Sequence, residues 1–227
     1  MQSTPVYAVI VAGGQGTRMG TAVPKQFLEL CGKPVLYHTL QAFRRAFEEA
    51  HLILVLPPHQ ISYAQMVLQA FPERIDVTLV SGGETRFHSV QNGLEGIPLD
   101  AIVMVHDGVR PLVSPALIQK CYAQAVEKGS AIPAIPATDS LRQLDGERYK
   151  PINRNHIRLM QTPQSFKASI LLPAMQQAYQ EGFTDEATVV EHYGETIFLI
   201  EGEKHNLKIT TPEDLTIAEA LMKTRNL

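Results

Sequence analysis

Residues 6–20 of the chain read VYAVIVAGGQGTRMG, and Pro24 and Lys25 follow after three further residues. The continuous apolar run at 6–11 is typical of a strand buried on both faces of a parallel sheet. The glycines after it let the backbone approach a phosphate, and successive N–H groups bind an anion. Arg18 and Lys25 add two cations that would neutralise a triphosphate. This stretch therefore predicts an α/β fold with a phosphate site at the end of its first strand.

Apolar runs and helical patterns alternate along the chain beyond this stretch. We expect strands at residues 6–11, 51–56, 76–80, 101–105 and 130–135. We expect helices at residues 35–46, 60–71, 84–94 and 115–127, the last with Ser114 as its N-cap. This βαβα alternation predicts a Rossmann-like three-layer αβα sandwich, with a mostly parallel sheet and helices on both faces.

The alternation breaks at residues 138–155, where the flanks of Asp145-Gly146 are polar. An Asp-Gly pair is a hairpin-turn signal, so we expect a β-hairpin arm that leaves the body of the domain. Beyond it we expect helices at 164–179, 185–192 and 211–223, and strands at 196–201 and 206–209. Residues 1–227 would then form a single domain with an arm at 138–155.

Composition argues against several classes of protein. Of the 227 residues, 44% are hydrophobic and 19% are charged, which suits a packed core. A net charge of −3 without blocks of like charge argues against a nucleic-acid partner and against a polybasic membrane anchor. Two distant cysteines, Cys31 and Cys121, make no thiolate zinc site and suggest a reducing compartment. The apolar run at 6–12 is too short for a signal peptide or a membrane span, so we expect a cytoplasmic protein.

Two commoner phosphate loops are excluded by spacing. Met19 stands where a G-x-G-x-x-G loop needs its third glycine, and Pro34 follows Gly32-Lys33 where a G-x-x-x-x-G-K-[ST] loop needs a hydroxyl. The plain alternative is a glycine-rich turn with two solvated cations. Nothing in the pattern around Lys25 suggests that this lysine is buried.

Four segments together resemble one family of enzymes. Besides the glycine loop they are GGETRFHSV at residues 82–90, HDGVRP at 106–111 and QTPQSF at 161–166. The ordered set spans nearly the whole chain. It is similar to the sugar-nucleotidyltransferase superfamily and, within it, to the 2-C-methyl-D-erythritol 4-phosphate cytidylyltransferases of the non-mevalonate isoprenoid pathway. The resemblance implies transfer of a cytidylyl group from CTP to a polyol phosphate, with Mg²⁺ as cofactor and pyrophosphate as leaving group.

The resemblance also implies roles for residues at matching positions. The implied catalytic residues are Arg18, Lys25 and Lys208. The implied nucleotide-binding residues are Ala12, Gly13, Gly14, Gly16, Gly83, Glu84, Ser89 and Asp107. The implied acceptor-binding residues are Asp107, Arg110, Ser140, Arg154, Thr162 and Thr184. The family also implies a homodimer in which each arm carries Ser140 and Arg154 into the partner's site.

Asp107 and Arg110 suit a ligand on chemical grounds as well. Asp107 follows the strand at 101–105, and the carboxyl ends of parallel strands form the usual ligand crevice. It would bind hydroxyls, or Mg²⁺ directly or through water; otherwise the phosphates of CTP hold the metal. The alternative is an aspartate that caps the next turn. Arg110 carries a planar fork suited to a phosphate, and its alternative is a surface salt bridge.

Each remaining candidate also has a structural alternative. Glu84 would accept a hydrogen bond from the exocyclic amine of cytosine, or its charge would simply complement the helix dipole at a helix N-terminus. Lys208 would protect a strand edge, and Thr184 would cap a helix. Arg154 would pair with a surface carboxylate of its own chain. These alternatives stay open at the level of sequence.

Departures from the family pattern bear on the substrate. Val11-Ala12-Gly13-Gly14 stands where the family usually shows P-A-A-G, and this form is typical of the sister family, ribitol-5-phosphate cytidylyltransferase. Glu84 replaces an Asp, Ser140 a Thr and Asn153 an Asp. Against this, the context of Arg154 and the T-D-E-A segment at 184–187 favour methylerythritol phosphate.

Two other classes of function compete with a transferase. A dinucleotide-dependent oxidoreductase lacks support, since the third glycine and an acidic residue after the second strand are missing. A non-catalytic nucleotide-binding module is disfavoured because Arg18, Lys25, Asp107 and Lys208 are all retained.

Overall fold

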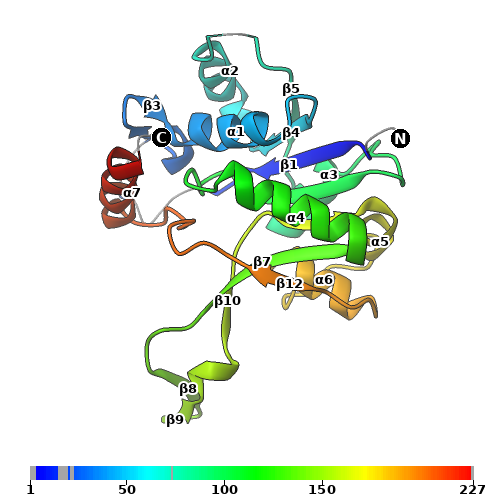
Figure 1. Cartoon of the computed structure of the whole chain (residues 1–227), viewed down its shortest axis with the longest axis vertical. Helices are drawn as coiled ribbons and strands as arrows, with labels where there is room; N and C mark the ends of the chain where they lie inside the picture. Colours follow the sequence, from blue (N-terminus) through cyan, green and yellow to red (C-terminus); the bar gives the residue numbers. More distant parts are fainter. Residues whose placement is uncertain (1–3, 15–19, 21–22, 73, 226–227) are drawn as a thin grey trace.

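A computed structural model describes residues 4–14, 20, 23–72 and 74–225 of the chain. Gly16 and Arg18, two of the predicted site residues, lie outside this part. Figure 1 shows a central sheet between layers of helices, with a thin hairpin extending from one side of the body. The α/β sandwich predicted from the sequence is confirmed.

The parallel half of the sheet is built around its first strand. The strand β1 (Val6–Val11) lies between β4 (His51–Leu56) and β6 (Ile102–Asp107), and it is parallel to both. The edge strand β5 (Val77–Ser81) is parallel to β4. The predicted strands at 6–11 and 51–56 have the bounds expected, and the other two are displaced by one or two residues.

The other half of the sheet contains antiparallel strands that the sequence did not predict. The strand β11 (Gln164–Lys167) lies antiparallel between β6 and β7 (Ser130–Pro136). Along β7 run β10 (Arg158–Met160), antiparallel, and β12 (Leu199–Glu201), parallel. The helix expected at 164–179 is therefore wrong at both ends, since residues 164–167 are a strand and the helix extends only over residues 168–174. Residues 164–167 fill a gap between two strands, where both backbone edges are paired.

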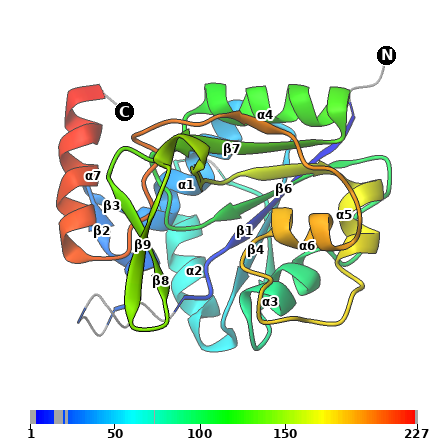
Figure 2. The same ribbon diagram turned by 90° about the horizontal axis from the view of Figure 1, so that it is seen from below.

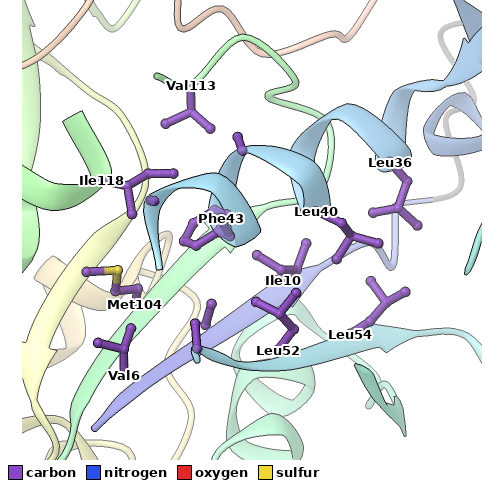
Figure 3. Close-up of a cluster of buried hydrophobic side chains, with 14 of the residues drawn as sticks. Val6, Ile10, Leu36, Leu40, Phe43, Leu52, Leu54, Met104, Val113 and Ile118 are labelled. Atoms are coloured by element: carbon purple, nitrogen blue, oxygen red, sulfur yellow. The ribbon is translucent and has the colours of Figure 1, made fainter. Parts of the chain in front are cut away.

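Helices cover both faces of this sheet. Side chains of β1 alternate, so that Ala8 and Ile10 face one helical layer and Val9 faces the other. The first layer, drawn close up in Figure 3, contains α1 (Val35–Ala46), α2 (Ile61–Gln69) and α4 (Pro115–Lys128). The second layer contains α3 (Arg86–Gly93), α5 (Ala168–Ala174) and α6 (Glu186–His192). At one end of the sandwich, α7 (Pro212–Arg225) packs over a smaller apolar cluster.

Capping residues begin and end α4, and the sequence predicted the first of them, Ser114. The hydroxyl of Ser114 accepts the N–H of Leu117 at 3.0 Å, and Gly129 ends the helix with φ +94°. Short elements complete the inventory: β2 (Glu29–Leu30), β3 (Lys33–Pro34) and the 3-10 turns η2 (Lys25–Phe27), η3 (Pro58–Gln60) and η4 (Arg154–His156). None of the helices in the described ranges is both long and apolar enough to cross a bilayer.

The arm forms the hairpin predicted around Asp145-Gly146. Its strands β8 (Leu141–Asp145) and β9 (Arg148–Ile152) pair only with each other, apart from the main sheet. Gly146 lies in the turn with φ +61°, a conformation that glycine adopts without strain. Leu144 pairs with Tyr149, and both side chains are mostly exposed. In Figure 1 the arm extends beyond the body of the molecule, and in Figure 2, seen from below, it lies in front of the body.

Candidate active site

A cavity lies where the winding of the sheet reverses. From β1 the chain builds β4 and β5 on one side, and it then returns to place β6 on the other side. The carboxyl ends of β1 and β6 therefore lie together, with Val11 opposite Asp107. Ligands of open α/β sheets bind at such a reversal. A cavity of about 330 Å³ opens at this point.

The cavity brings together most of the predicted site residues that the structure describes. They come from four separate segments of the chain and face one space. The predicted residues that line it are Ala12, Gly13, Gly14, Lys25, Gly83, Glu84, Ser89, Asp107 and Lys208. Arg110 and Thr162 lie behind Asp107, whereas Ser140, Arg154 and Thr184 do not line the cavity.

Asp107 is a buried carboxylate surrounded by cations. The Nζ of Lys208 and the Nε of Arg110 each lie 3.1 Å from its Oδ2 atom. The Nε of Arg86 lies 3.7 Å from its Oδ1 atom, beyond hydrogen-bonding distance. Burial by itself would raise the pKa of Asp107, but Lys208, Arg86 and Arg110 together hold that pKa well below its usual range. Asp107 is therefore ionised, and its Oδ1 atom accepts no hydrogen bond from a described residue.

Arg110 is held inside the protein, so its expected alternative as a surface salt bridge is wrong. Its Nε donates to Asp107, and its Nη1 donates to the carbonyl of Asn206 at 2.8 Å. Its side chain is only 11% exposed. Arg110 thereby joins the end of β6 to the loop that carries Lys208.

Lys25 is buried, contrary to the sequence-based expectation. It is 8% exposed, and its Nζ donates to the carbonyl of Ile209 at 2.9 Å. The 3-10 turn that contains it packs against the start of the glycine loop: Gln26 donates to the Ala12 carbonyl, and a Cβ atom on Gly14 would lie 3.8 Å from Cε of Lys25. Lys25 also lines the cavity. Lys25 thus lies beside the same loop as Lys208.

Residues 206–209 form a loop and not the predicted strand. A single backbone hydrogen bond, from Ile209 N–H to the Val109 carbonyl, joins this segment to its neighbour. The N–H of Asn206 donates locally to the Glu203 carbonyl, and the side-chain amide of Asn206 donates to the Thr162 carbonyl at 2.9 Å. The segment passes across the strand ends without running alongside one, so no ladder forms. Lys208, 40% exposed, projects from it toward Asp107, which rules out the alternative of strand-edge protection.

A tight turn at residues 83–89 forms part of the cavity wall. The Ser89 hydroxyl accepts the N–H of Gly83 at 3.1 Å and donates to the carbonyl of Thr85 at 2.9 Å. A Cβ atom on Gly83 would lie 2.5 Å from the Cβ of His88, so this position has no room for a side chain. Ser89 therefore holds the turn in shape, which leaves the backbone of the turn to face a ligand.

Glu84 precedes the helix that was expected to include it. The helix α3 begins at Arg86, and Thr85 is its N-cap. Glu84 is exposed and lines the cavity. Two positions before the helix, it is placed to meet a ligand as well as to complement the helix dipole.

Thr162 supports Asp107 from behind and does not face the cavity. Its hydroxyl oxygen accepts the Asp107 N–H at 3.1 Å and lies 2.9 Å from Nδ1 of His106. The Nε2 of His106 lies 3.4 Å from the Arg110 carbonyl, which only accepts, so the proton of the neutral ring belongs on Nε2. Burial lowers the pKa of His106 to about 3, more than the attraction of Asp107 raises it, and the ring stays neutral.

Several cavity residues were missed by the sequence analysis, among them Arg86 and Gln26. Arg86 lines the cavity, and its terminal nitrogens pair with both oxygens of Glu186 at 2.6 and 2.9 Å. Gln26 is fully buried, and its Nε2 donates to the Ala12 carbonyl and to Gln60, each at 2.7 Å. Both lie inside motifs that were recognised. The available signal was a charged or amide side chain directly beside a glycine turn.

The described residues do not form a metal cage of their own. No group of three or more His, Cys, Asp or Glu side chains in the described ranges could hold an ion. Asp107 offers one oxygen, and its other oxygen is occupied by two cations. This donor set fits Mg²⁺ only where most ligands come from phosphates and water, which is the usual mode for nucleotide enzymes.

The arm lies apart from this cavity, and of the T-D-E-A segment only Glu186 approaches it, through its pair with Arg86. Arg154 and Ser140 are exposed, and Arg154 donates to the carbonyl of Thr138. Among the described residues, Arg154 has no carboxylate partner, so the expected own-chain ion pair is wrong. At α6 the N-cap is Asp185, whose Oδ1 accepts the Thr188 N–H at 2.9 Å, and Thr184 is not the cap.

Comparison with known proteins gives a consistent match along nearly the whole chain. The family model of 2-C-methyl-D-erythritol 4-phosphate cytidylyltransferase matches residues 6–224. A protein of that name from Bacteroides fragilis is 45% identical over 215 residues, covering 95% of this chain and 98% of that protein. One from Geobacillus kaustophilus is 38% identical over 221 residues, with 96% and 97% covered.

Solved structures share the fold as well. The crystal structure of 2-C-methyl-D-erythritol 4-phosphate cytidylyltransferase from Thermus thermophilus is 36% identical, with a TM-score of 0.78, and the match covers 97% of this chain and 100% of that one. The 4-diphosphocytidyl-2C-methyl-D-erythritol synthase from Anaerococcus prevotii is 27% identical, with a TM-score of 0.82 and coverage of 97% and 99%.

Proposed function

Because the chain belongs to the 2-C-methyl-D-erythritol 4-phosphate cytidylyltransferase family, we propose that its cavity divides into a nucleotide side and an acceptor side. The enzyme transfers a cytidylyl group from CTP to 2-C-methyl-D-erythritol 4-phosphate and releases pyrophosphate, giving 4-diphosphocytidyl-2-C-methyl-D-erythritol. Ribitol phosphate transfer, dinucleotide-dependent oxidation and a non-catalytic nucleotide-binding module are set aside in favour of this reaction.

The main support for these two sides of the cavity is the set of cations around one carboxylate, at the point where the strand order of the sheet reverses. Lys208, Arg110 and Arg86 surround Asp107, and Lys25 reaches the same loop through Ile209. These positive charges lie beside a glycine loop whose N–H groups suit phosphates. They would stabilise the negative charge that accumulates at phosphorus during transfer.

On the nucleotide side, we assign the triphosphate to the glycine loop and the base to the turn at residues 83–89. Ala12, Gly13, Gly14 and Lys25 line the part of the cavity nearest β1. Gly16 and Arg18 continue the same loop, and Arg18 is assigned to the phosphates together with Lys25. The backbone of the turn held by Ser89, with Glu84, offers acceptors to the exocyclic amine that distinguishes cytosine from uracil.

The reaction needs no covalent enzyme nucleophile. An oxygen of the acceptor's own phosphate attacks the α-phosphorus of CTP in line. A new P–O bond forms there while the bond to the oxygen that bridges the α- and β-phosphates breaks, and that oxygen leaves with pyrophosphate. Positioning and charge compensation by Arg18, Lys25 and Lys208 supply the acceleration.

We assign Mg²⁺ to the triphosphate and not to a protein cage. Asp107 is the carboxylate placed to hold it, through Oδ1 directly or through a water molecule. Bound there, the ion would neutralise phosphate charge. The same Oδ1 atom would otherwise accept a hydrogen bond from a hydroxyl of the ribose or the acceptor.

On the acceptor side, we assign Arg110 and Thr162 to positioning and the arm to a second copy of the chain. Thr162 and Arg110 act through Asp107, as their hydrogen bonds indicate. Thr184 is exposed and does not line the cavity, and it is assigned to the acceptor on resemblance alone. The exposed Leu144 and Tyr149 of the hairpin favour a homodimer in which Ser140 and Arg154 serve the partner's site.

We place the enzyme in the cytoplasm. Both cysteines are unpaired, with Cys121 buried and Cys31 exposed, as suits a reducing compartment.

Measurement of pyrophosphate release with a panel of acceptors tests the assignment. The purified chain with CTP and Mg²⁺ should release pyrophosphate with 2-C-methyl-D-erythritol 4-phosphate at a kcat/KM at least tenfold above that with ribitol 5-phosphate. A panel without added acceptor controls for simple CTP hydrolysis. Equal rates with ribitol 5-phosphate, or release independent of the acceptor, would overturn the assignment.

A further inference from the structure

An ion pair beside the cavity joins Arg86 to Glu186, a residue that the assignments above do not use. Arg86, the first residue of α3, lines the cavity with a side chain that is 28% exposed. Glu186, the first residue of α6, has a side chain that is only 2% exposed. Two parallel hydrogen bonds, at 2.6 and 2.9 Å, join the two side chains. Such a bidentate pair fixes the plane of the guanidinium as well as its position.

This pair is not needed to attach α6 to the sheet. The side chain of Gln164, on β11, accepts the N–H of Ala187 and donates to Oδ2 of Asp185, each at 2.8 Å. Asp185 also caps the helix through Thr188. The N-terminus of α6 is thus anchored by residues other than Arg86, so Glu186 is carried by a fixed element. The pair therefore restrains Arg86 and does little to tether the helix.

The restraint has a consequence for Asp107. Its Oδ2 atom is occupied by Lys208 and Arg110, while Arg86 stops 3.7 Å short of its Oδ1 atom. A guanidinium released by Glu186 would close on this oxygen, since the remaining attraction draws it there. We propose that Glu186 is a positioning residue for the transfer reaction: it holds Arg86 in the cavity wall and keeps Oδ1 of Asp107 available to a ligand. This inference rests on the proposed role of Asp107 in binding substrate.

A double-mutant cycle tests the proposal. Glu186→Gln preserves size but replaces one acceptor oxygen with a donor that opposes Arg86. At 25 °C, kcat/KM should fall by roughly tenfold to a hundredfold, as expected for a misplaced group in a preorganised site. In an Arg86→Met background the same Glu186→Gln change should leave kcat/KM unaltered, because no guanidinium remains to move.

Thr188→Val provides the matched control. It removes the hydroxyl that donates to Asp185 at 2.7 Å and weakens the cap of α6 without touching Arg86. It should lower Tm but leave kcat/KM near that of the wild type. A normal kcat/KM in Glu186→Gln would overturn the proposal, as would an equal loss in the Arg86→Met background or a loss that Thr188→Val reproduces. If the wild-type chain itself failed to release pyrophosphate, the proposed function would be at fault and not the role of Glu186.

Discussion

Lys208 reaches from a partly exposed loop to within 3.1 Å of the buried Oδ2 atom of Asp107. The next residue of that loop, Ile209, accepts a hydrogen bond from Lys25. One short loop therefore connects two cations and the carboxylate at the end of β6. The predictions below follow from this arrangement and from the turn and arm around it.

Removal of the Lys25 charge should stop turnover while the fold persists. In Lys25→Met the stem still fills its buried site, but the ammonium is lost from the phosphate side of the cavity. We expect kcat to fall by about a hundredfold or more, the usual effect of losing one preorganised charge contact. Lys33→Met is the control, since Lys33 also donates to a backbone carbonyl, that of Ala70, but lies outside the cavity. Wild-type kcat in a folded Lys25→Met protein would refute the assignment.

Ser89→Ala should weaken the choice of CTP over UTP. Without this hydroxyl, the Gly83 N–H loses its partner and the Thr85 carbonyl keeps only the Ser89 N–H, so the turn loosens. We expect the ratio of kcat/KM for CTP over UTP to fall by roughly tenfold, equivalent to about 1.4 kcal/mol. Ser130→Ala removes a similar buried hydroxyl far from the cavity and should leave the ratio intact. Equal ratios in the wild type and Ser89→Ala would show that the turn does not select the base.

Chelation should silence the enzyme without unfolding it. Excess EDTA should abolish pyrophosphate release, and added Mg²⁺ should restore it, because the metal is expected to bind with the triphosphate. The Tm of the protein without CTP should not change with EDTA, since the described residues contain no metal cluster. Full activity in excess EDTA, or a large fall in Tm, would contradict this mode of metal binding.

Subunit complementation should reveal whether the arm serves a second copy. Lys25→Ala and Arg154→Ala should each be inactive alone. Unfolded together and refolded, they should form mixed dimers in which one site combines an intact Lys25 with an intact arm. Random pairing makes about half of the dimers mixed, so about a quarter of the sites should recover. Mixed dimers without recovered activity would show that Arg154 does not act across the interface.

The buried His106 should make the fold sensitive to acid. Its pKa is lowered from 6.5 to about 3, so between these values the unfolded chain takes up a proton that the folded chain does not. The free energy of unfolding should therefore fall as pH drops below about 6.5, by at most about 1.4 kcal/mol per pH unit from this group. Urea titrations at several pH values give the free energy of unfolding as a function of pH. The slope of this free energy against pH should be shallower in His106→Gln and unchanged in the control, His59→Gln, which replaces an exposed histidine. Identical slopes in the wild type and His106→Gln would rule out this source of acid sensitivity.

The elements that the sequence predicted best are those with a complete local pattern. The strands at 6–11 and 51–56 and the helix at 35–46 have the predicted bounds, because each carries its own period of apolar residues. The hairpin was equally local, since Asp145-Gly146 sets its turn. The predictions for short segments were wrong because these segments lack such a pattern. Residues 164–167 and 206–209 carry too few residues to show a period, and their neighbours in the sheet decided their conformation.

The class of fold, the glycine-rich segment after β1 and the carboxylate at the end of β6 could be predicted from the sequence, because the patterns that indicate them are local. How these parts act together depends on the tertiary structure. It buried Lys25, moved Thr162 behind Asp107 and paired Arg86 with Glu186 from another helix. It also left one oxygen of Asp107 exposed to the cavity while two cations occupied the other. Such relations depend on distances between segments far apart in the chain, and no local period or spacing encodes them.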